Sequence, residues 1–338
     1  MTELVINQPW KEQSLTLKDA DIQDESRETG EILFQKLELA KTEIEENDKI
    51  KEQCLQQLKE WISQNGDIEN CLTDDNFLLR FLRTRKYSLF MAEQMILKYL
   101  NFRKKFVRYM GMMDYLEPNV NDLMSNGYLF ASPFRDSEGR RVVIYDIAKF
   151  DLQKHSNDDM ARAHAIAYET IIEDEETQIL GVNHIADMSG ISPAFTTLFS
   201  VTEFTRLITW GEQSIPLRHK EINLLNVPTA LKYVYDYALS KMSKKLRHRF
   251  EVHDSFSSLT AKVDKKCLPL EFGGVMPSAE MIQLWKKELS EKRDRLLSMT
   301  KMELLSDKGI ISRKTIEEHT NGFNMEGLTG CFRKLEVD

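Results

Sequence analysis

The chain has 338 residues and a formal net charge of −8, and its composition, 41% hydrophobic and 30% charged, is that of an ordinary folded protein. The acidic balance argues against nucleic-acid binding, which requires a dominant basic face. The longest apolar runs, such as Val142–Tyr145, fall far short of the roughly 18 residues that a membrane-spanning helix needs, and the first residues lack the basic and apolar regions of a secretory signal. We therefore expect a cytoplasmic protein whose membrane contact is peripheral.

The four cysteines have neither metal-ligand spacing nor a disulfide pattern. They are Cys54, Cys71, Cys267 and Cys331, with no CxxC pair and no histidine at ligand spacing. This arrangement predicts reduced cysteines, no metal site and no cofactor.

The N-terminal part of the chain is predicted to be an arm followed by helices. Residues 1–45 are expected to be mobile or loosely helical, because the first 30 are polar, aperiodic and acidic. Apolar residues at helical spacing run from Leu33 to Ile62 and predict an amphipathic helix in two pieces. The helical N-terminal domain is placed at residues 46–112.

A helix pair is predicted over residues 73–106. Asp74 or Asp75 can cap the first helix, and Ser88 starts the second. The first helix also carries a run of cations, Arg80, Arg83, Arg85 and Lys86. A solvated helix face is the commoner meaning of such a run, and we interpret it that way in preference to a binding site.

The spacing of apolar residues changes after Gly127, where a sheet is expected to begin. A turn signal at Asp136–Gly139 precedes the first β-branched run. The predicted strands are Arg141–Ile147, Val182–Asp187, Ile222–Asn226 and a short one over 249–253. The predicted helices start at Asn157 (to about Gln178), Pro193, Pro228 (to about Arg249) and Ser278 (to about Leu297).

Alternating strands and helices predict an α/β fold with a mainly parallel sheet and right-handed crossovers. The sheet domain is placed at residues 113–277. Residues 278–338 are expected to be a C-terminal helix and a polar tail.

Positive charge is concentrated in Ile215–Phe250, which has eight Lys or Arg residues against two acids, Glu221 and Asp236. In an acidic chain this asymmetry indicates an anionic partner. Apolar residues alternate with the charges, so the pattern favours a lipid surface, where phosphate and hydrocarbon lie together.

Four of these cations are expected to converge. Arg218 and Lys220 are two residues apart in an extended segment, so their side chains point the same way. Lys245 and Arg249 end the predicted helix from Pro228 within the arc of its apolar stripe. Two such pairs can chelate a doubly phosphorylated headgroup. Two other readings remain open: cations at a helix C-terminus interact favourably with the helix dipole, and a basic surface can dock an acidic protein.

Three segments resemble the CRAL-TRIO family of lipid-binding proteins, in the branch of the tocopherol-transfer and cellular retinaldehyde-binding proteins. They are DNFLLRFLRTRKYS (Asp75–Ser88), IPLRHKEINLLNVP (Ile215–Pro228) and LPLEFGG (Leu268–Gly274). The resemblance covers about Ile50–Leu289. It implies an N-terminal helical subdomain, followed by a lipid-binding domain with a mainly parallel sheet and a helical lid.

In that branch four basic residues bind phosphatidylinositol bisphosphate, and the matching positions here are Arg218, Lys220, Lys245 and Arg249. The resemblance also implies a hydrophobic pocket, whose matching positions are His164, Tyr168, Val182, His184, Ala186, Phe199, Trp210, Ile215, Ile222, Leu224, Val234 and Tyr237. His184 can hydrogen-bond a polar ligand head, although a lone strand histidine is more often satisfied within the core.

The resemblance therefore implies a non-catalytic cytoplasmic carrier. It would bind one small hydrophobic molecule, retinoid or tocopherol-like, and exchange it at phosphoinositide-containing endosomal or plasma membranes. A monomer without nucleic-acid partners is expected. One alternative is transfer of phospholipid or phosphatidylinositol, against which stands Leu217, where the yeast phosphatidylinositol-transfer branch tends to carry an acid. A second is an α/β enzyme acting on a lipid ester, although no GxSxG, GxGxxG or phosphate loop is found.

Overall fold

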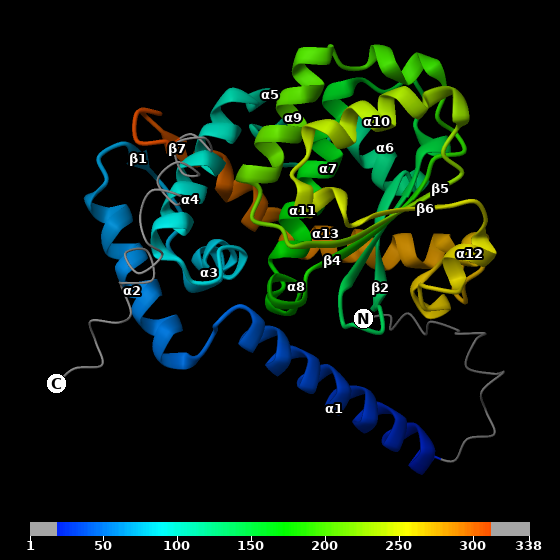
Figure 1. Cartoon of the computed structure of the whole chain (residues 1–338), viewed down its shortest axis with the longest axis horizontal. Coiled ribbons are helices and arrows are strands. Elements are labelled where there is room, and N and C mark those ends of the chain that lie inside the picture. The colour runs from blue at the N-terminus through cyan, green and yellow to red at the C-terminus, as the bar shows by residue number, and fades with distance from the viewer. Residues whose placement is uncertain (1–18, 312–338) are drawn as a thin grey trace, which may run out of the picture.

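A computed structural model describes residues 19–311, with side chains from residue 30 onward (Figure 1). The N-terminal helices are α1 (Asp19–Glu43), α2 (Asp48–Gln64), α3 (Asp75–Thr84) and α4 (Leu89–Lys105). Two side chains cap the starts of these helices. Asn47 accepts from the Ile50 amide at 2.9 Å at the start of α2, and Asp74 accepts from the Phe77 amide at 3.1 Å at the start of α3. The expected break in the first helix is thus confirmed. The predicted N-terminal arm contains α1, and residues 1–18 of it lie outside the described part.

The helices α2 to α4 share a hydrophobic core that the end of the described chain completes. Met299, Met302 and Leu304 are buried in this core. The two-residue strands β1 (Ile68–Glu69) and β7 (Glu303–Leu304) pair antiparallel beside it. Segments more than 200 residues apart therefore close one core.

The central sheet has the strand order β2-β3-β4-β5-β6 in the described residues. Its first two strands form an antiparallel hairpin around the predicted turn, and the others are parallel. The strands are β2 (Leu129–Arg135), β3 (Arg141–Asp146), β4 (Val182–Asp187), β5 (His219–Leu225) and β6 (Phe250–His253). The α/β fold with a mainly parallel sheet is confirmed.

Helices cover this sheet and fill a second, larger core. The long helix α13 (Ser278–Ser298) buries Trp285 and Leu289 in that core. The other helices are α5 (Val107–Met110), α6 (Pro118–Asn126), α7 (Asn157–Ile172), α8 (Glu175–Leu180), α9 (Val201–Ser214), α10 (Lys232–Lys241), α11 (Lys244–Arg247) and α12 (Phe256–Thr260). In Figure 1, α9 and α10 lie at the top and α1 crosses below the sheet.

Three predicted helices are interrupted, and these predictions were wrong. The helix expected over 157–178 does begin at Asn157, after the cap Ser156, but it divides into α7 and α8. The helix expected from Pro193 begins as a 3-10 turn before α9. The helix expected over 228–249 breaks between α10 and α11. In each case an interior Asp or Ser, namely Asp174, Ser200 or Ser243, accepts from backbone amides and starts a new helix.

The basic run on α3 is not a solvated face. Arg80 and Arg83 are 0% and 1% exposed. Arg80 donates to Glu169 on α7 at 2.8 Å and pairs with Glu173, the residue after α7. Arg83 pairs with Glu46 at 2.9 Å and with Glu175 of α8 at 3.0 Å. These ion pairs join the helical domain to the sheet domain.

Substitution of Arg80 by Met should destabilise the fold by about 3–5 kcal/mol, because it strands the Glu169 carboxylate without its buried partner. Chemical denaturation measures the change. The matched control is Lys59→Met, which removes an exposed pair with Asp75 and should cost under about 1 kcal/mol. Equal, small losses in both variants would refute a structural role for the buried pairs.

Candidate functional site

A cavity of about 640 Å³ lies between the carboxyl ends of the central strands and the helices above them. Its lining is almost entirely apolar, which is the usual character of a site for a small hydrophobic ligand. The lining residues are Tyr128, Ile147, Met160, His164, Met188, Ile191, Phe195, Thr196, Leu198, Phe199, Val201, Phe204, Leu224, Val227, Pro228, Leu231, Tyr233, Val234, Tyr235, Tyr237 and Ala238.

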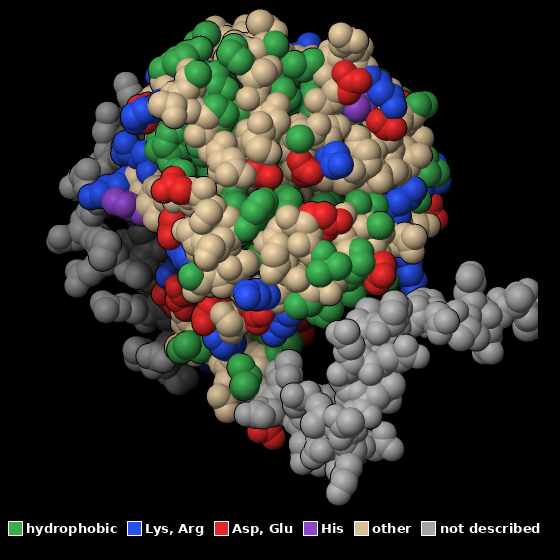
Figure 2. Space-filling model, turned by 90° about the vertical axis from the view of Figure 1, so that its right-hand side faces the viewer, with side chains coloured by type: hydrophobic (Ala, Val, Ile, Leu, Met, Phe, Trp, Pro, Cys, Tyr) green, Lys and Arg blue, Asp and Glu red, His purple; other side chains and the backbone are tan. Residues whose placement is uncertain are grey.

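The helices α9 and α10 form the roof of the cavity. Tyr237 on α10 and Thr205 on α9 are joined by a hydrogen bond of 2.7 Å. Val201 and Tyr233 line the cavity yet are 69% and 65% exposed. Figure 2 shows hydrophobic side chains gathered toward the upper end of the molecule, where these two helices lie in Figure 1. The roof is therefore the part of the cavity wall in contact with the surroundings.

Five of the twelve predicted pocket residues line this cavity: His164, Phe199, Leu224, Val234 and Tyr237. The other seven lie outside its lining, because the cavity occupies the carboxyl ends of the strands and not the whole sheet face. They are Val182, His184, Ala186 and Ile222 on the strands, Tyr168 on α7, and Trp210 and Ile215 at the end of α9.

Two of these seven, Tyr168 and His184, belong to a buried chain of hydrogen bonds that starts at the cavity. The Tyr128 hydroxyl lies 2.9 Å from Nε2 of His164, whose Nδ1 lies 3.4 Å from the Tyr168 hydroxyl. Tyr145 donates to Tyr168 at 3.2 Å and lies 2.9 Å from Nδ1 of His184.

The chain ends at His219, where strand β5 begins. Nε2 of His184 lies 2.8 Å from Nδ1 of His219. Burial lowers the pKa of His164 to about 4, and burial together with the charge of Arg249 lowers the pKa of His219 to about 4. The pKa of His184 is lowered by burial and by both neighbouring histidines. All three rings are therefore neutral at neutral pH.

The four predicted cations come together at the amino ends of β5 and β6. Loss of solvent contact lowers the pKa of Lys245, and the charges of Arg249, Lys86 and Arg218 lower it further. Loss of solvent contact and the charge of Arg218 likewise lower the pKa of Lys220. Backbone pairing places Arg249 beside β5, since its carbonyl accepts from the Ile222 amide at 2.9 Å. With the repulsion that acts on Lys245, this brings the two predicted pairs into one cation cluster (Arg218, Lys220, Lys245 and Arg249).

A glycine allows Arg218 to reach this position. Gly181 has φ of 88°, and a Cβ there would lie 2.5 Å from the Arg218 carbonyl oxygen. That oxygen accepts from the Val182 amide at 2.9 Å, and the Arg218 guanidinium donates to the Ile179 carbonyl. Arg218 is thus fixed against the start of β4 by both backbone and side chain.

Sequence reasoning missed two charged residues of this region. Lys86 follows α3 with φ of 51° and contributes positive charge to the cluster. Glu43, the last residue of α1, pairs with Lys220 at 3.2 Å and with Arg218 at 3.3 Å. The unusual backbone at Lys86 has no sequence signal of its own, and Glu43 lies 175 residues from its partner Arg218.

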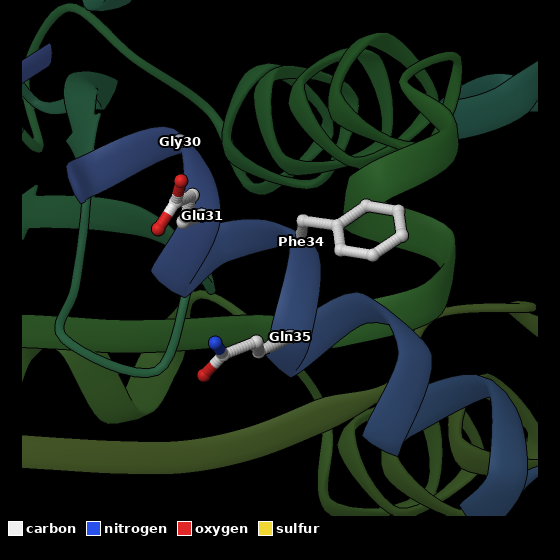
Figure 3. A pocket seen from close by; sticks show the side chains of 4 residues that line it. All are labelled: Gly30, Glu31, Phe34 and Gln35. Atoms are coloured by element: carbon white, nitrogen blue, oxygen red, sulfur yellow. The ribbon is translucent and has the colours of Figure 1, made fainter. Parts of the chain in front are cut away.

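A second hollow lies beside α1. Among the residues whose side chains are described, Gly30, Glu31, Phe34 and Gln35 line it. Figure 3 shows Phe34 pointing away from Glu31 and Gln35. Because these four residues belong to one helix and Phe34 is 63% exposed, we do not treat this hollow as the ligand site.

Within residues 19–311, no group of three or more His, Cys, Asp or Glu side chains is arranged to hold a metal ion. None of the helices in the same range combines the length and hydropathy required to traverse a bilayer.

Comparison with known proteins identifies the domain around the cavity. Residues 125–274 match the family model of the CRAL/TRIO domain. Clavesin-1 of Xenopus laevis is 28% identical over 246 residues, covering 72% of this chain and 74% of the relative. Clavesin-2 of Homo sapiens is 27% identical over 246 residues, covering 72% and 75%. A solved structure titled "Crystal structure of Sfh5" aligns with a TM-score of 0.47 and 16% identity over 73% of this chain and 99% of that one.

Protein stability should fall as the pH drops from about 6.5 toward 4. In this window the unfolded chain protonates its histidines, whereas folded His164 and His219 stay neutral because their pKa is about 4. Each such histidine lowers the free energy of unfolding by about 1.4 kcal/mol for each unit that the pH falls. His219→Gln should reduce that slope, measured by denaturation across the window, whereas His248→Gln, at an exposed position, should not. An unchanged slope in the first variant would contradict a neutral buried His219.

Proposed function

We propose that the chain is a lipid-binding protein of the CRAL/TRIO family, whose domain model matches residues 125–274, and that it is a non-catalytic carrier of one small hydrophobic molecule. The observation that carries the proposal is the apolar cavity of about 640 Å³ under the roof of α9 and α10. A volume of this size fits a retinoid or a tocopherol-like lipid.

The polar wall of the cavity supports a cargo with one oxygen-containing end. Tyr128 and His164 are the start of the hydrogen-bond chain and also line the cavity. A hydroxyl or aldehyde oxygen placed there can exchange hydrogen bonds with these two groups, while the rest of the cargo contacts hydrocarbon. Leu217, without charge, gives no support to intact phosphatidylinositol as cargo.

The cation cluster supports delivery at membranes that contain phosphatidylinositol bisphosphate. Three of its members, Arg218, Lys220 and Arg249, are half-buried, and Lys245 is exposed. Clustered cations with lowered pKa gain by binding a multivalent phosphate, which relieves their mutual repulsion. Lys245 lies four residues beyond the end of α10, so headgroup binding and the cavity roof share one segment.

Among the side chains described, those of residues 30–311, no arrangement that supports catalysis on a lipid ester is found. The Ser189 amide donates to Asp187 at 3.0 Å, a contact that shapes the turn after β4. The cavity histidine His164 contacts tyrosine hydroxyls, not a serine or cysteine. We therefore propose binding and exchange as the whole activity.

Native mass spectrometry of protein expressed in lipid-rich cells should show one bound small lipid. Ala238→Trp fills the cavity from α10 and should weaken cargo binding about tenfold, since overpacking costs about 1–3 kcal/mol. Ala230→Trp, on the same segment but exposed and outside the lining, is the matched control. Absence of any cargo, or equal effects of both substitutions, would overturn the carrier proposal, and steady hydrolysis of a lipid ester would favour the enzyme alternative.

Lys245→Glu should weaken binding to vesicles containing phosphatidylinositol bisphosphate by about tenfold or more, because each cation near an anionic surface contributes about 1 kcal/mol and the reversal counts twice. Lys244→Glu, next to it on α11 and equally exposed, makes the same change in net charge and should have a much smaller effect. Flotation measures both. Vesicles with matched phosphatidylserine charge test headgroup selectivity, and identical behaviour of the two variants would disprove the cluster assignment.

A further inference from the structure

The cation cluster already holds a carboxylate. Oε2 of Glu43 lies 3.2 Å from Nζ of Lys220 and 3.3 Å from the guanidinium of Arg218. The side chains of Lys220 and Arg218 are 21% and 11% exposed, whereas that of Glu43 is 54% exposed. One oxygen thus bridges two members of the cluster, which is the contact that a phosphate oxygen would make.

The charge of Glu43 acts on more of the cluster than its two direct partners. Burial opposes its ionisation, but the hydrogen bond from Lys220 and the charges of Lys220, Arg218 and Lys86 outweigh this, so the pKa of Glu43 is lowered. Desolvation lowers the pKa of Arg249, and the charge of Glu43 opposes that lowering. Glu43 therefore compensates three of the four cations.

The fold keeps Glu43 in place from both sides. Three residues later, Glu46 is 5% exposed and pairs with the buried Arg83, and Ile44 is 0% exposed. Along α1, Lys36 pairs with Glu138 at 2.6 Å at the tip of the β2–β3 hairpin. A short tether to a fixed point gives the carboxylate a high effective concentration at the cluster.

The helix that carries Glu43 is itself acidic. Its sequence has eight Asp or Glu residues against three Lys or Arg, which gives a net charge of 3 − 8 = −5. An anionic membrane attracts the cluster and repels this helix. Because α1 ends at the cluster, a membrane approaching the cluster also meets this like-charged helix.

We propose that the end of α1 is an intramolecular ligand of the cation cluster, with the Glu43 carboxylate in the position of a lipid phosphate group. This inference rests on the proposed phosphoinositide recognition and adds its regulation. Headgroup binding requires Glu43 to leave, so the closed form binds phosphoinositide more weakly than the cluster itself can. The acidic helix then moves away from the membrane while Glu46 remains anchored.

Glu43→Gln tests the proposal with a near-isosteric loss of charge. We expect about three- to tenfold tighter binding both to phosphatidylinositol bisphosphate vesicles and to the soluble inositol phosphate headgroup, since two partly exposed ion pairs no longer compete. The difference from the wild type should shrink as salt is raised. Glu38→Gln is the matched control, because Glu38 pairs with Lys41 inside α1 and not with the cluster.

The possible outcomes distinguish competition by Glu43 from phosphoinositide recognition itself. Failure of the wild type and of both variants to bind any phosphoinositide would refute the recognition itself. Binding by the wild type with no gain in Glu43→Gln, or an equal gain in Glu38→Gln, would overturn the intramolecular ligand alone. A gain on vesicles without a gain for the soluble headgroup would also overturn it, because it would place the effect on membrane repulsion and not on the anion site.

Hydrogen exchange provides a second readout that needs no variant. The amides of Ile44 and Glu46, which donate to Ala40 and Lys41 across the end of α1, should lose protection when the wild type binds phosphoinositide, because the helix turns there while Glu46 stays paired. Unchanged protection of these two amides at saturation would overturn the proposal.

Discussion

The buried ion pairs of Arg80 and Arg83 are the constraint on which the arrangement of the molecule depends. They connect α3 to Glu169 and Glu173 at the end of α7, and to Glu46 at the junction of α1 and α2. A buried pair adds little net stability compared with apolar packing, but it is costly to break, so its main effect is to admit one geometry. The helical domain, the sheet domain and α1 are therefore held in one relative arrangement.

The position of the cation cluster follows from this arrangement of the domains. After α3 the chain turns with positive φ at Lys86 and Tyr87, and the Tyr87 side chain is 1% exposed. The charge of Lys86, within this turn, acts on Lys245 of the cluster. The same α3 contact fixes Glu46, and hence Glu43, which contacts Arg218 and Lys220. Cations and their internal anion are thus placed by one set of buried contacts.

The parallel strands β3 to β6 could be predicted from sequence, because β-branched runs and alternating elements indicate a parallel sheet. The strand order was not predicted, and neither were β1, β2 and β7. The helix breaks could not be predicted, since a Ser or Asp inside an apolar repeat caps a new helix only when the tertiary fold bends the chain there. Arg80 and Arg83 were predicted to be solvated because cations usually are, and because their acidic partners lie far away in the sequence. Burial of such side chains is a property of the assembled domains, not of the local spacing.

The candidate site, like the fold, could be predicted from sequence only in part. Convergence of Arg218 with Lys220 follows from the alternation of an extended chain, and it is seen in the structure. The extent of the cavity does not follow from alternation: His184 and Ala186 share the expected face, yet the cavity lies beyond them at the carboxyl ends of the strands. How far α9 presses onto the sheet depends on contacts such as that of Trp210 with Phe106 of the helical domain, whose ring centroids are 5.9 Å apart.

Cavity and cation cluster lie at opposite ends of the strands, and two structures connect them. The first is the hydrogen-bond chain. A hydroxyl has one proton, so Tyr145, which donates to Tyr168, must accept from Nδ1 of His184; Nε2 of His184 then accepts from Nδ1 of His219. Every member is neutral, and the direction of donation is the same along the chain. Because the positive charge of Arg249 disfavours a second proton on His219, a change in charge at the cluster alters the polarisation of the groups that line the cavity.

The second connection is the break between α10 and α11. Ser243 caps α11 through its side chain, while its amide donates to Glu212 on α9 at 2.9 Å. The break lets α10 line the cavity and α11 present Lys245 to the cluster at different angles, which one continuous helix could not do. Under the proposed function, a phosphate that draws Lys245 and Arg249 together would act on this joint and, through Glu212, on α9. The joint, which the predicted uninterrupted helix lacked, would then couple phosphate binding at the cluster to both helices of the cavity roof.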